Sequence, residues 1–250
     1  MVIAETYRYQ NFAKKTPDMR PLTTTVLVSL AAVLLVLSGN FIHKVDFQIH
    51  QNPFVNGLAK YQLFAVLIGM IAVIFILITR PESQALLSIG ELSTIATKEK
   101  WLGINGKSTW LNNGLQLLIG ISLATGIFMF LGVNYTNSLN NFHWWFMPYV
   151  LLFSLTNSFT EEMIFRFAVI AGLENYCSKF IILIISAVIF GLPHYFGNPS
   201  GIIGVIMSGA LGYILCKATI ETKGISIAWI IHFVQDIIIF TAIMMMNTKP

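Results

Sequence analysis

The chain has 250 residues, of which 56% are hydrophobic and only 10% are charged, and its formal net charge is +4. A soluble domain has about a quarter of its residues charged, so this composition excludes an ordinary soluble protein and indicates a polytopic membrane protein. The small positive charge gives no reason to expect a nucleic-acid partner, because the basic residues lie in loops beside the apolar runs.

The apolar runs predict an all-α transmembrane bundle of about seven to eight spans, since each span needs about 20 residues. Residues 1–21 are predicted to form a cytoplasmic N-terminal tail. The run that follows is longer than the apolar core of a signal peptide and no cleavage site follows it, so it is predicted to be a retained first span. The predicted spans cover about residues 22–42, 60–79, 109–132, 145–173, 179–192, 201–216 and 225–246.

The N-terminal spans lie within residues 22–144, which also contain the longest polar segment, 82–107. The spacing of apolar residues in that segment predicts an amphipathic stretch along the membrane interface, or an eighth span if it inserts. Basic residues collect in the tail, in this segment and in the loops that follow residues 173 and 216. The positive-inside rule therefore predicts a cytoplasmic N-terminus.

Three charged residues, Glu161, Glu162 and Arg166, lie inside the long apolar run that begins at Trp145. Each charge costs about 2.5–3.5 kcal/mol in a membrane span, so their presence needs an explanation. Glu162 and Arg166 are four residues apart on one helix face, which predicts a structural ion pair. Glu161 points elsewhere and must find a partner on another helix or stay partly protonated, which makes it a candidate general base.

Further polar residues occur at membrane depth in the later spans. His194 follows Pro193, which is predicted to kink the fifth span, and His232 and Asp236 share one face of the last span. Glu161 and Asp236 would lie about 18 Å and about 17 Å from the cytoplasmic ends of their helices, so these groups can meet in one polar cavity. Two simpler explanations stay open: a histidine that only makes an interhelical hydrogen bond, and Asp236 as the counter-charge of Arg166.

Three motifs stand in order along the segment 145–240: Glu161-Glu162-x-x-x-Arg166, Phe190-x-x-x-His194 and His232-x-x-x-Asp236. This pattern resembles the CPBP family, the CAAX-protease and bacteriocin-processing (Abi) intramembrane proteases, which includes the type II CAAX prenyl endopeptidases. The resemblance implies that residues 145–246 form the catalytic core.

The resemblance also implies roles for these residues. Glu161 and His194 would activate a water, while His232 and Asp236 would stabilise the oxyanion or orient its donors. Arg166, Phe190 and Glu162 would support the architecture, with Glu162 alternatively sharing the base role. The family's third motif varies between Asn and Asp, so the resemblance leaves open whether Asp236 donates or accepts a hydrogen bond.

No cofactor is favoured, and zinc is the alternative, with Glu161, His194 and His232 as its ligands. The chain lacks His-Glu-x-x-His, which places two ligands and a base on one helix, so a metal-free glutamate mechanism is preferred. This mechanism predicts that Glu161, Glu162 and His194 cluster. His232 and Asp236 are predicted to face them across a cavity wide enough for a peptide carbonyl.

The predicted function is an intramembrane endopeptidase that cleaves a membrane-associated peptide or protein, such as a CAAX tail, a pheromone precursor or a bacteriocin leader. Its expected partners are the lipid bilayer and that substrate, and its expected location is a bacterial plasma membrane. Two alternatives remain. A proton-coupled transporter could use the acids as a relay, although the sequence shows no inverted repeat. A non-catalytic membrane partner, such as an immunity protein, could keep the same residues without turnover.

Overall fold

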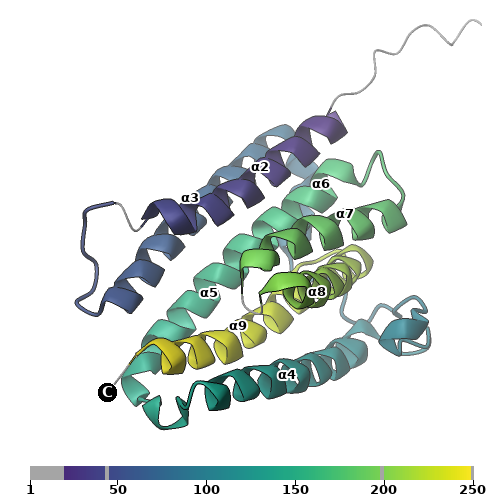
Figure 1. Ribbon diagram of the computed structural model, residues 1–250. Coiled ribbons are helices and arrows are strands. Elements are labelled where there is room, and N and C mark those ends of the chain that lie inside the picture. The colour runs from purple at the N-terminus through teal and green to yellow at the C-terminus, as the bar shows by residue number, and fades with distance from the viewer. Residues whose placement is uncertain (1–19, 43–44, 198–199, 249–250) are drawn as a thin grey trace, which may run out of the picture.

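The computed structural model describes residues 20–42, 45–197 and 200–248. This part of the chain is a helical bundle that contains two isolated β-bridges but no β-strand (Figure 1). The prediction of an all-α fold is confirmed. The α-helices are α2 (Arg20–Phe41), α3 (Pro53–Thr79), α4 (Trp110–Tyr135), α5 (Met147–Glu162), α6 (Val169–Leu173), α7 (Lys179–Gly191), α8 (Gly201–Thr222) and α9 (Ser226–Asn247). The 3₁₀ turns that the structure describes in full are η2 (Pro81–Leu87), η3 (Lys100–Leu102), η4 (Leu139–Asn141), η5 (Trp144–Phe146) and η7 (Leu192–Phe196), and a π-helical stretch is η6 (Met163–Ala168).

Within the described residues, five helical segments are long and apolar enough to cross a membrane: Pro53–Thr79, Trp110–Tyr135, Lys179–Phe196, Gly201–Thr222 and Ser226–Asn247. They correspond to five of the predicted spans. The first predicted span coincides with α2, and the fourth with the uninterrupted helical run from α5 through η6 to α6. Large apolar side chains on α3 and α4 point out of the bundle, as lipid-facing residues do, for example Ile71, Ile78, Leu123 and Ile127.

Two helix ends differ from the prediction because buried lysines have polar partners. The helix α3 begins at Pro53 instead of near residue 60, and Asn52 caps it by accepting hydrogen bonds from backbone amides. Lys60 therefore lies inside the helix, where its Nζ donates to the carbonyl oxygen of Val45 at 2.7 Å. The helix α8 continues past residue 216 to Thr222. Its buried lysine, Lys217, is neutralised by Glu221 at 2.6 Å.

The segment 82–107 is not one amphipathic helix but two short 3₁₀ turns joined by loop. It is attached to the end of α8, because the amide of Glu91 donates to the carbonyl of Thr222 at 2.7 Å. The indole of Trp110, at the start of α4, donates to Glu221 at 2.9 Å. Exposed apolar side chains remain on this segment at Ile89, Ile95 and Trp101. Its position along the membrane interface stays a prediction.

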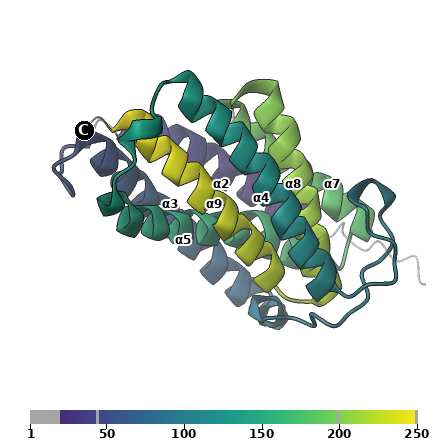
Figure 2. The same ribbon diagram turned by 90° about the horizontal axis from the view of Figure 1, so that it is seen from below.

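The helices are arranged so that α9 lies between α5 and α4, while α5 also packs against α3 (Figures 1 and 2). The helices α7 and α8 pack against each other at close range. The turns around residues 80–109, 174–178 and 223–225 gather at one end of the bundle, away from the C-terminus (Figure 1). Most of the basic loop residues lie at this end, which agrees with the charge asymmetry on which the predicted orientation rests.

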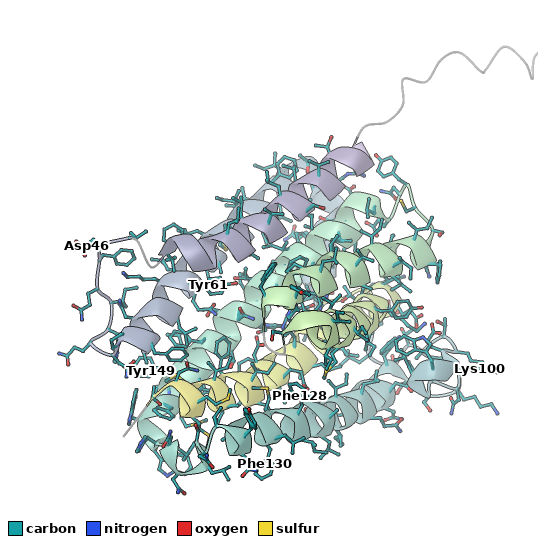
Figure 3. The ribbon with its side chains drawn as sticks, viewed as in Figure 1. Asp46, Tyr61, Lys100, Phe128, Phe130 and Tyr149 are labelled. Atoms are coloured by element: carbon teal, nitrogen blue, oxygen red, sulfur yellow. The ribbon has the colours of Figure 1, made fainter. Side chains whose placement is uncertain are left out.

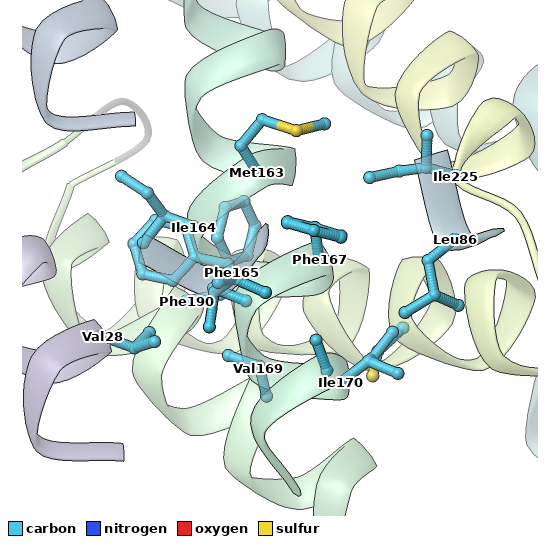
Figure 4. Close-up of a cluster of buried hydrophobic side chains, with 14 of the residues drawn as sticks. Val28, Leu86, Met163, Ile164, Phe165, Phe167, Val169, Ile170, Phe190 and Ile225 are labelled. Carbon is cyan, nitrogen blue, oxygen red and sulfur yellow. The ribbon is translucent and has the colours of Figure 1, made fainter. Parts of the chain in front are cut away.

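The most completely buried part of the chain directly follows the two glutamates. Every residue from Met163 to Leu173 is buried, and the aromatic and aliphatic side chains of this stretch pack against Val28, Leu86 and Ile225 (Figure 4). A π-helical turn holds one residue more than an α-helical turn and is rare outside functional sites. The helix that carries the charged motif is therefore fixed from behind by a dense core.

Candidate active site

Glu161 and Glu162 occupy different environments although they are neighbours at the end of α5. The side chain of Glu162 is fully buried, and its Oε1 lies 3.2 Å from Nη2 of Arg166 in η6. The side chain of Glu161 is 14% exposed and lines an internal cavity. The ion pair predicted from the four-residue spacing is present, and Glu161, which has no partner on its own helix, is the glutamate that lines the cavity.

Arg166 is held by an ion pair and an aromatic ring. Among the described residues its guanidinium nitrogens make no hydrogen bond, but the group lies 4.0 Å from the centre of the Phe190 ring. Phe190 is itself almost completely buried and also contacts the rings of His194 and His232, at centroid distances of 4.9 and 5.6 Å. One aromatic ring therefore supports three polar groups of the predicted site.

His232 lies in contact with both glutamates. Its Nδ1 donates to Oε1 of Glu162 at 2.7 Å, while its Nε2 lies 3.4 Å from Oε2 of Glu161 and 3.7 Å from Oδ1 of Asp236. The partner that Glu161 required on another helix is thus His232. The sequence-based prediction that His232 faces the glutamates from across the cavity is therefore wrong. Since α9 packs directly against α5, a buried imidazole there reaches the carboxylates themselves.

His194 reaches the cavity from η7, where the chain turns after α7. Pro193 stands at the start of this turn, and the helix α7 ends at Gly191, as the proline predicted. The Nδ1 of His194 lies 2.8 Å from the carbonyl oxygen of Phe190. A carbonyl only accepts, so this nitrogen carries the hydrogen and Nε2 is left as an acceptor in the neutral ring.

The cavity has a volume of about 280 Å³ and is lined from α3, α4, α5, α7, η7, α8 and α9. A water molecule occupies about 30 Å³ in the liquid, so the space can hold several waters or a short piece of peptide backbone. Two lining side chains, Tyr61 on α3 and Phe128 on α4, come from opposite sides of the bundle (Figure 3). The polar lining residues are Asn157, Glu161, His194, Ser208, His232, Gln235 and Asp236, with Thr125 on the α4 wall.

Asp236 lies in the cavity wall and is not the counter-charge of Arg166, whose acidic partner is Glu162. One oxygen of Asp236, Oδ2, accepts a hydrogen bond from Nδ2 of Asn157 at 3.2 Å. The sequence pattern did not single out Asn157 or its partner Gln62 as site residues. The available signal was the presence of amide side chains inside apolar spans.

The described residues contain no group of three or more His, Cys, Asp or Glu side chains arranged to hold a metal ion. The imidazole of His232 is instead directed to carboxylates through both ring nitrogens. What the geometry provides is a cavity with a partly exposed carboxylate, an acceptor nitrogen on His194 and an oriented imidazole. These are the groups that activation of water and stabilisation of an oxyanion need.

Comparison with known proteins gives one family match for this chain. Residues 143–238 match the family described as type II CAAX prenyl endopeptidase Rce1-like, and the matched segment contains all three motifs. None of the curated proteins and none of the solved structures compared with the chain matches it. Residues 143–238 are therefore similar to the Rce1-like family, and the match supports the assignment of this chain to the CPBP/CAAX protease family.

Proposed function

We propose that this chain is an intramembrane endopeptidase that hydrolyses a peptide bond of a membrane-associated substrate with a water activated by Glu161 and His194. At the level of the family, the Rce1-like match supports a CAAX-type intramembrane endopeptidase. The observation that carries the mechanism is the cavity, because Glu161, His194, His232 and Asp236 all line it.

The contacts of the two glutamates support different roles for them. Glu162 forms an ion pair with Arg166 and accepts a hydrogen bond from Nδ1 of His232. Its proposed role is to orient the imidazole. Each glutamate has one oxygen, Oε2, without a hydrogen bond in the described part of the chain, but of the two only Glu161 lines the cavity. Glu161 is therefore the better general base, and the acceptor nitrogen of His194 helps to hold the water.

The proposed reaction needs one water and one carbonyl group. Glu161 takes a proton from the water, and the resulting hydroxide attacks the carbonyl carbon to form a tetrahedral intermediate with a negatively charged oxygen. His232, oriented by Glu162 through Nδ1, presents Nε2 as a donor to that oxygen. As the carbon–nitrogen bond breaks, the leaving amine takes the proton that Glu161 received.

The proposed substrate is an extended segment of a membrane-associated peptide or protein. The cavity lining combines these polar groups with aromatic surface from Tyr61, Phe128 and Phe240. A peptide backbone beside apolar side chains fits such a lining. In the proposed orientation, the end of the bundle with the basic loops faces the cytoplasm.

The test is a comparison of the peptides present in membranes that contain the wild type or Glu161→Ala. We expect specific cleavage products with the wild type and their absence with Glu161→Ala. Glu91→Ala, which removes an exposed carboxylate far along the chain from the motif, serves as the matched control and should resemble the wild type. Equal yields of the same products with Glu161→Ala would overturn the mechanism, and an absence of products with the wild type would favour the non-catalytic alternative.

A further inference from the structure

We propose that Asn157 and Gln62 are positioning residues of the active site, which hold Asp236 through a directional chain of hydrogen bonds across three helices. The meaning of this chain for catalysis rests on the proposed function. The hydrogen-bond chain itself is defined by contacts between α3, α5 and α9, and its existence can be tested without measuring peptide cleavage.

The chain has three links. Asn157 Nδ2 donates to Asp236 Oδ2 at 3.2 Å, Gln62 Nε2 donates to Asn157 Oδ1 at 3.4 Å, and Thr156 Oγ1 donates to Gln62 Oε1 at 2.9 Å. Gln62 and Asp236 are each only 4% exposed, so water does not readily substitute for these links. The side chains of two consecutive α5 residues, Thr156 and Asn157, thus connect α3 with α9.

The direction of the two amide links is set at the Asp236 end, because the Thr156 hydroxyl can also donate to the carbonyl oxygen of Leu152 and accept from Gln62. A carboxamide has a donor end and an acceptor end, so reversing one amide obliges the next to reverse. If Gln62 were turned round, its oxygen would meet the oxygen of Asn157, and Asn157 would have to turn as well. The oxygen of Asn157 would then face Oδ2 of Asp236, which is unfavourable unless that carboxyl carries a proton. The direction from Gln62 through Asn157 to Asp236 is therefore the one that an ionised Asp236 requires.

This chain orients groups in the cavity. Asn157 fixes one oxygen of Asp236, and the other oxygen lies 3.7 Å from Nε2 of His232. Asn157 also lines the cavity together with Glu161, which stands four residues later on the same helix. Gln62 lies outside the segment 143–238 that matches the family. The hydrogen bonds therefore connect an earlier helix, α3, to the matched segment.

Charge-changing substitutions separate a directional role from mere packing, because Asn→Asp and Gln→Glu hardly alter volume. Asn157→Asp places two carboxylates at the 3.2 Å link, and Gln62→Glu removes the donor that Asn157 accepts from. In both cases Asp236→Asn introduces an amide that can donate to residue 157. The hydrogen bonds can then run in the opposite direction, from residue 236 toward residue 62.

We expect Asn157→Asp and Gln62→Glu each to lower kcat about tenfold or more with little change in KM. In the Asp236→Asn background, the same substitutions should cost less than about twofold. The same non-additivity should appear in the thermal midpoints of the purified variants in detergent. Asn112→Asp, at an exposed position early in α4, is the matched control and should behave alike in both backgrounds.

Additive losses in kcat, or additive losses in thermal midpoint, would overturn the proposed chain. If Asn157→Asp does not fold, Gln62→Glu provides the same test from the other end. A wild type that cleaves no peptide would overturn the proposed function, while the thermal midpoints would still decide whether the directional chain exists.

Discussion

The imidazole of His232 is the point at which the contacts of the site converge. It touches Glu162 through one nitrogen and approaches Glu161 and Asp236 through the other. The three acids are therefore not equivalent, because Glu162 is fully buried against Arg166 while Glu161 lines the cavity. This inequality gives each acid its own predicted phenotype.

Glu161→Gln should abolish most turnover while the protein remains folded. A glutamine keeps the shape but cannot take a proton, and a general base contributes about 10²–10⁴-fold to the rate. The measurement is kcat of the purified variant beside its thermal midpoint. Glu162→Gln is the comparison, and it should lower the thermal midpoint as well as the rate, since it weakens contacts to both Arg166 and His232. A Glu161→Gln variant with wild-type kcat would rule out the proposed base.

Arg166→Ala should destabilise the fold by about 3–5 kcal/mol, because it leaves the fully buried Glu162 without its ion-pair partner. Loss of the stacking on Phe190 adds to this effect. The check is the thermal midpoint in detergent, and adding Glu162→Gln should recover part of the loss. A stable but inactive Arg166→Ala would instead indicate that Arg166 contacts the substrate or the transition state.

Metal dependence has a direct test. We expect purified protein to keep its activity after treatment with a chelator, since the proposed mechanism assigns proton transfer to Glu161 and His194 themselves. Elemental analysis of the same sample supplies the companion measurement. Stoichiometric zinc that is lost together with activity, and restores activity when added back, would establish a metalloprotease instead.

At the scale of helices, the tight contact between α7 and α8 determines where His194 lies. A Cβ added to Gly191 would lie 2.7 Å from the carbonyl oxygen of Val205 and 3.0 Å from the Cα of Gly209. The small residues of α8 permit this close approach of the two helices. The 3₁₀ turn that carries His194 begins immediately after Gly191.

Gly191→Ala should therefore push α7 and α8 apart and lower both stability and kcat. Overpacking of this kind costs about 1–3 kcal/mol. Thermal unfolding and peptide cleavage would measure the two effects. Gly120→Ala in α4 is the matched control, because a Cβ there would meet nothing within 4 Å. Equal stability of the two variants would show that the α7–α8 contact can relax without cost.

The positions of most spans could be predicted because membrane helices require long apolar runs. The starts and ends that were missed, at Pro53 and Thr222, depend on Lys60 and Lys217. Lys60 donates to the carbonyl of Val45, and Lys217, paired with Glu221 on its own helix, also donates to Thr97 in a loop distant in the sequence. The π-helical stretch Met163–Ala168 has no composition signal of its own. Local patterns find helices well, but tertiary contacts decide how far those helices continue.

The site residues named from the three motifs all lie at or directly behind one cavity. The position of His232 was misjudged because helix depth was estimated along each span separately, without knowing that α9 packs directly on α5. The contribution of Gln62 could not be predicted, since nothing in the sequence shows that α3 faces Asn157. Motifs identify reactive groups, whereas their supporting contacts come from the packing of helices.

For the whole molecule, the cavity is composite. Its reactive groups come from α5, η7 and α9, within the Rce1-like segment, while α3 and α4 supply further wall residues such as Leu58, Tyr61, Ile121 and Phe128. A smaller side chain in that wall should alter substrate fit more than proton transfer. We therefore expect Phe128→Ala to change KM and the range of peptides cleaved, with kcat on good substrates within about threefold of wild type. A large loss of kcat with unchanged KM would contradict this division.

Because the cavity wall is composite, the residues that shape substrate binding and the proposed catalytic residues lie on different helices. Mutations in α3 and α4 can remodel what enters the cavity while the bond-breaking groups stay untouched. Homologues with this architecture could thus differ in substrate specificity while they share the proposed catalytic residues.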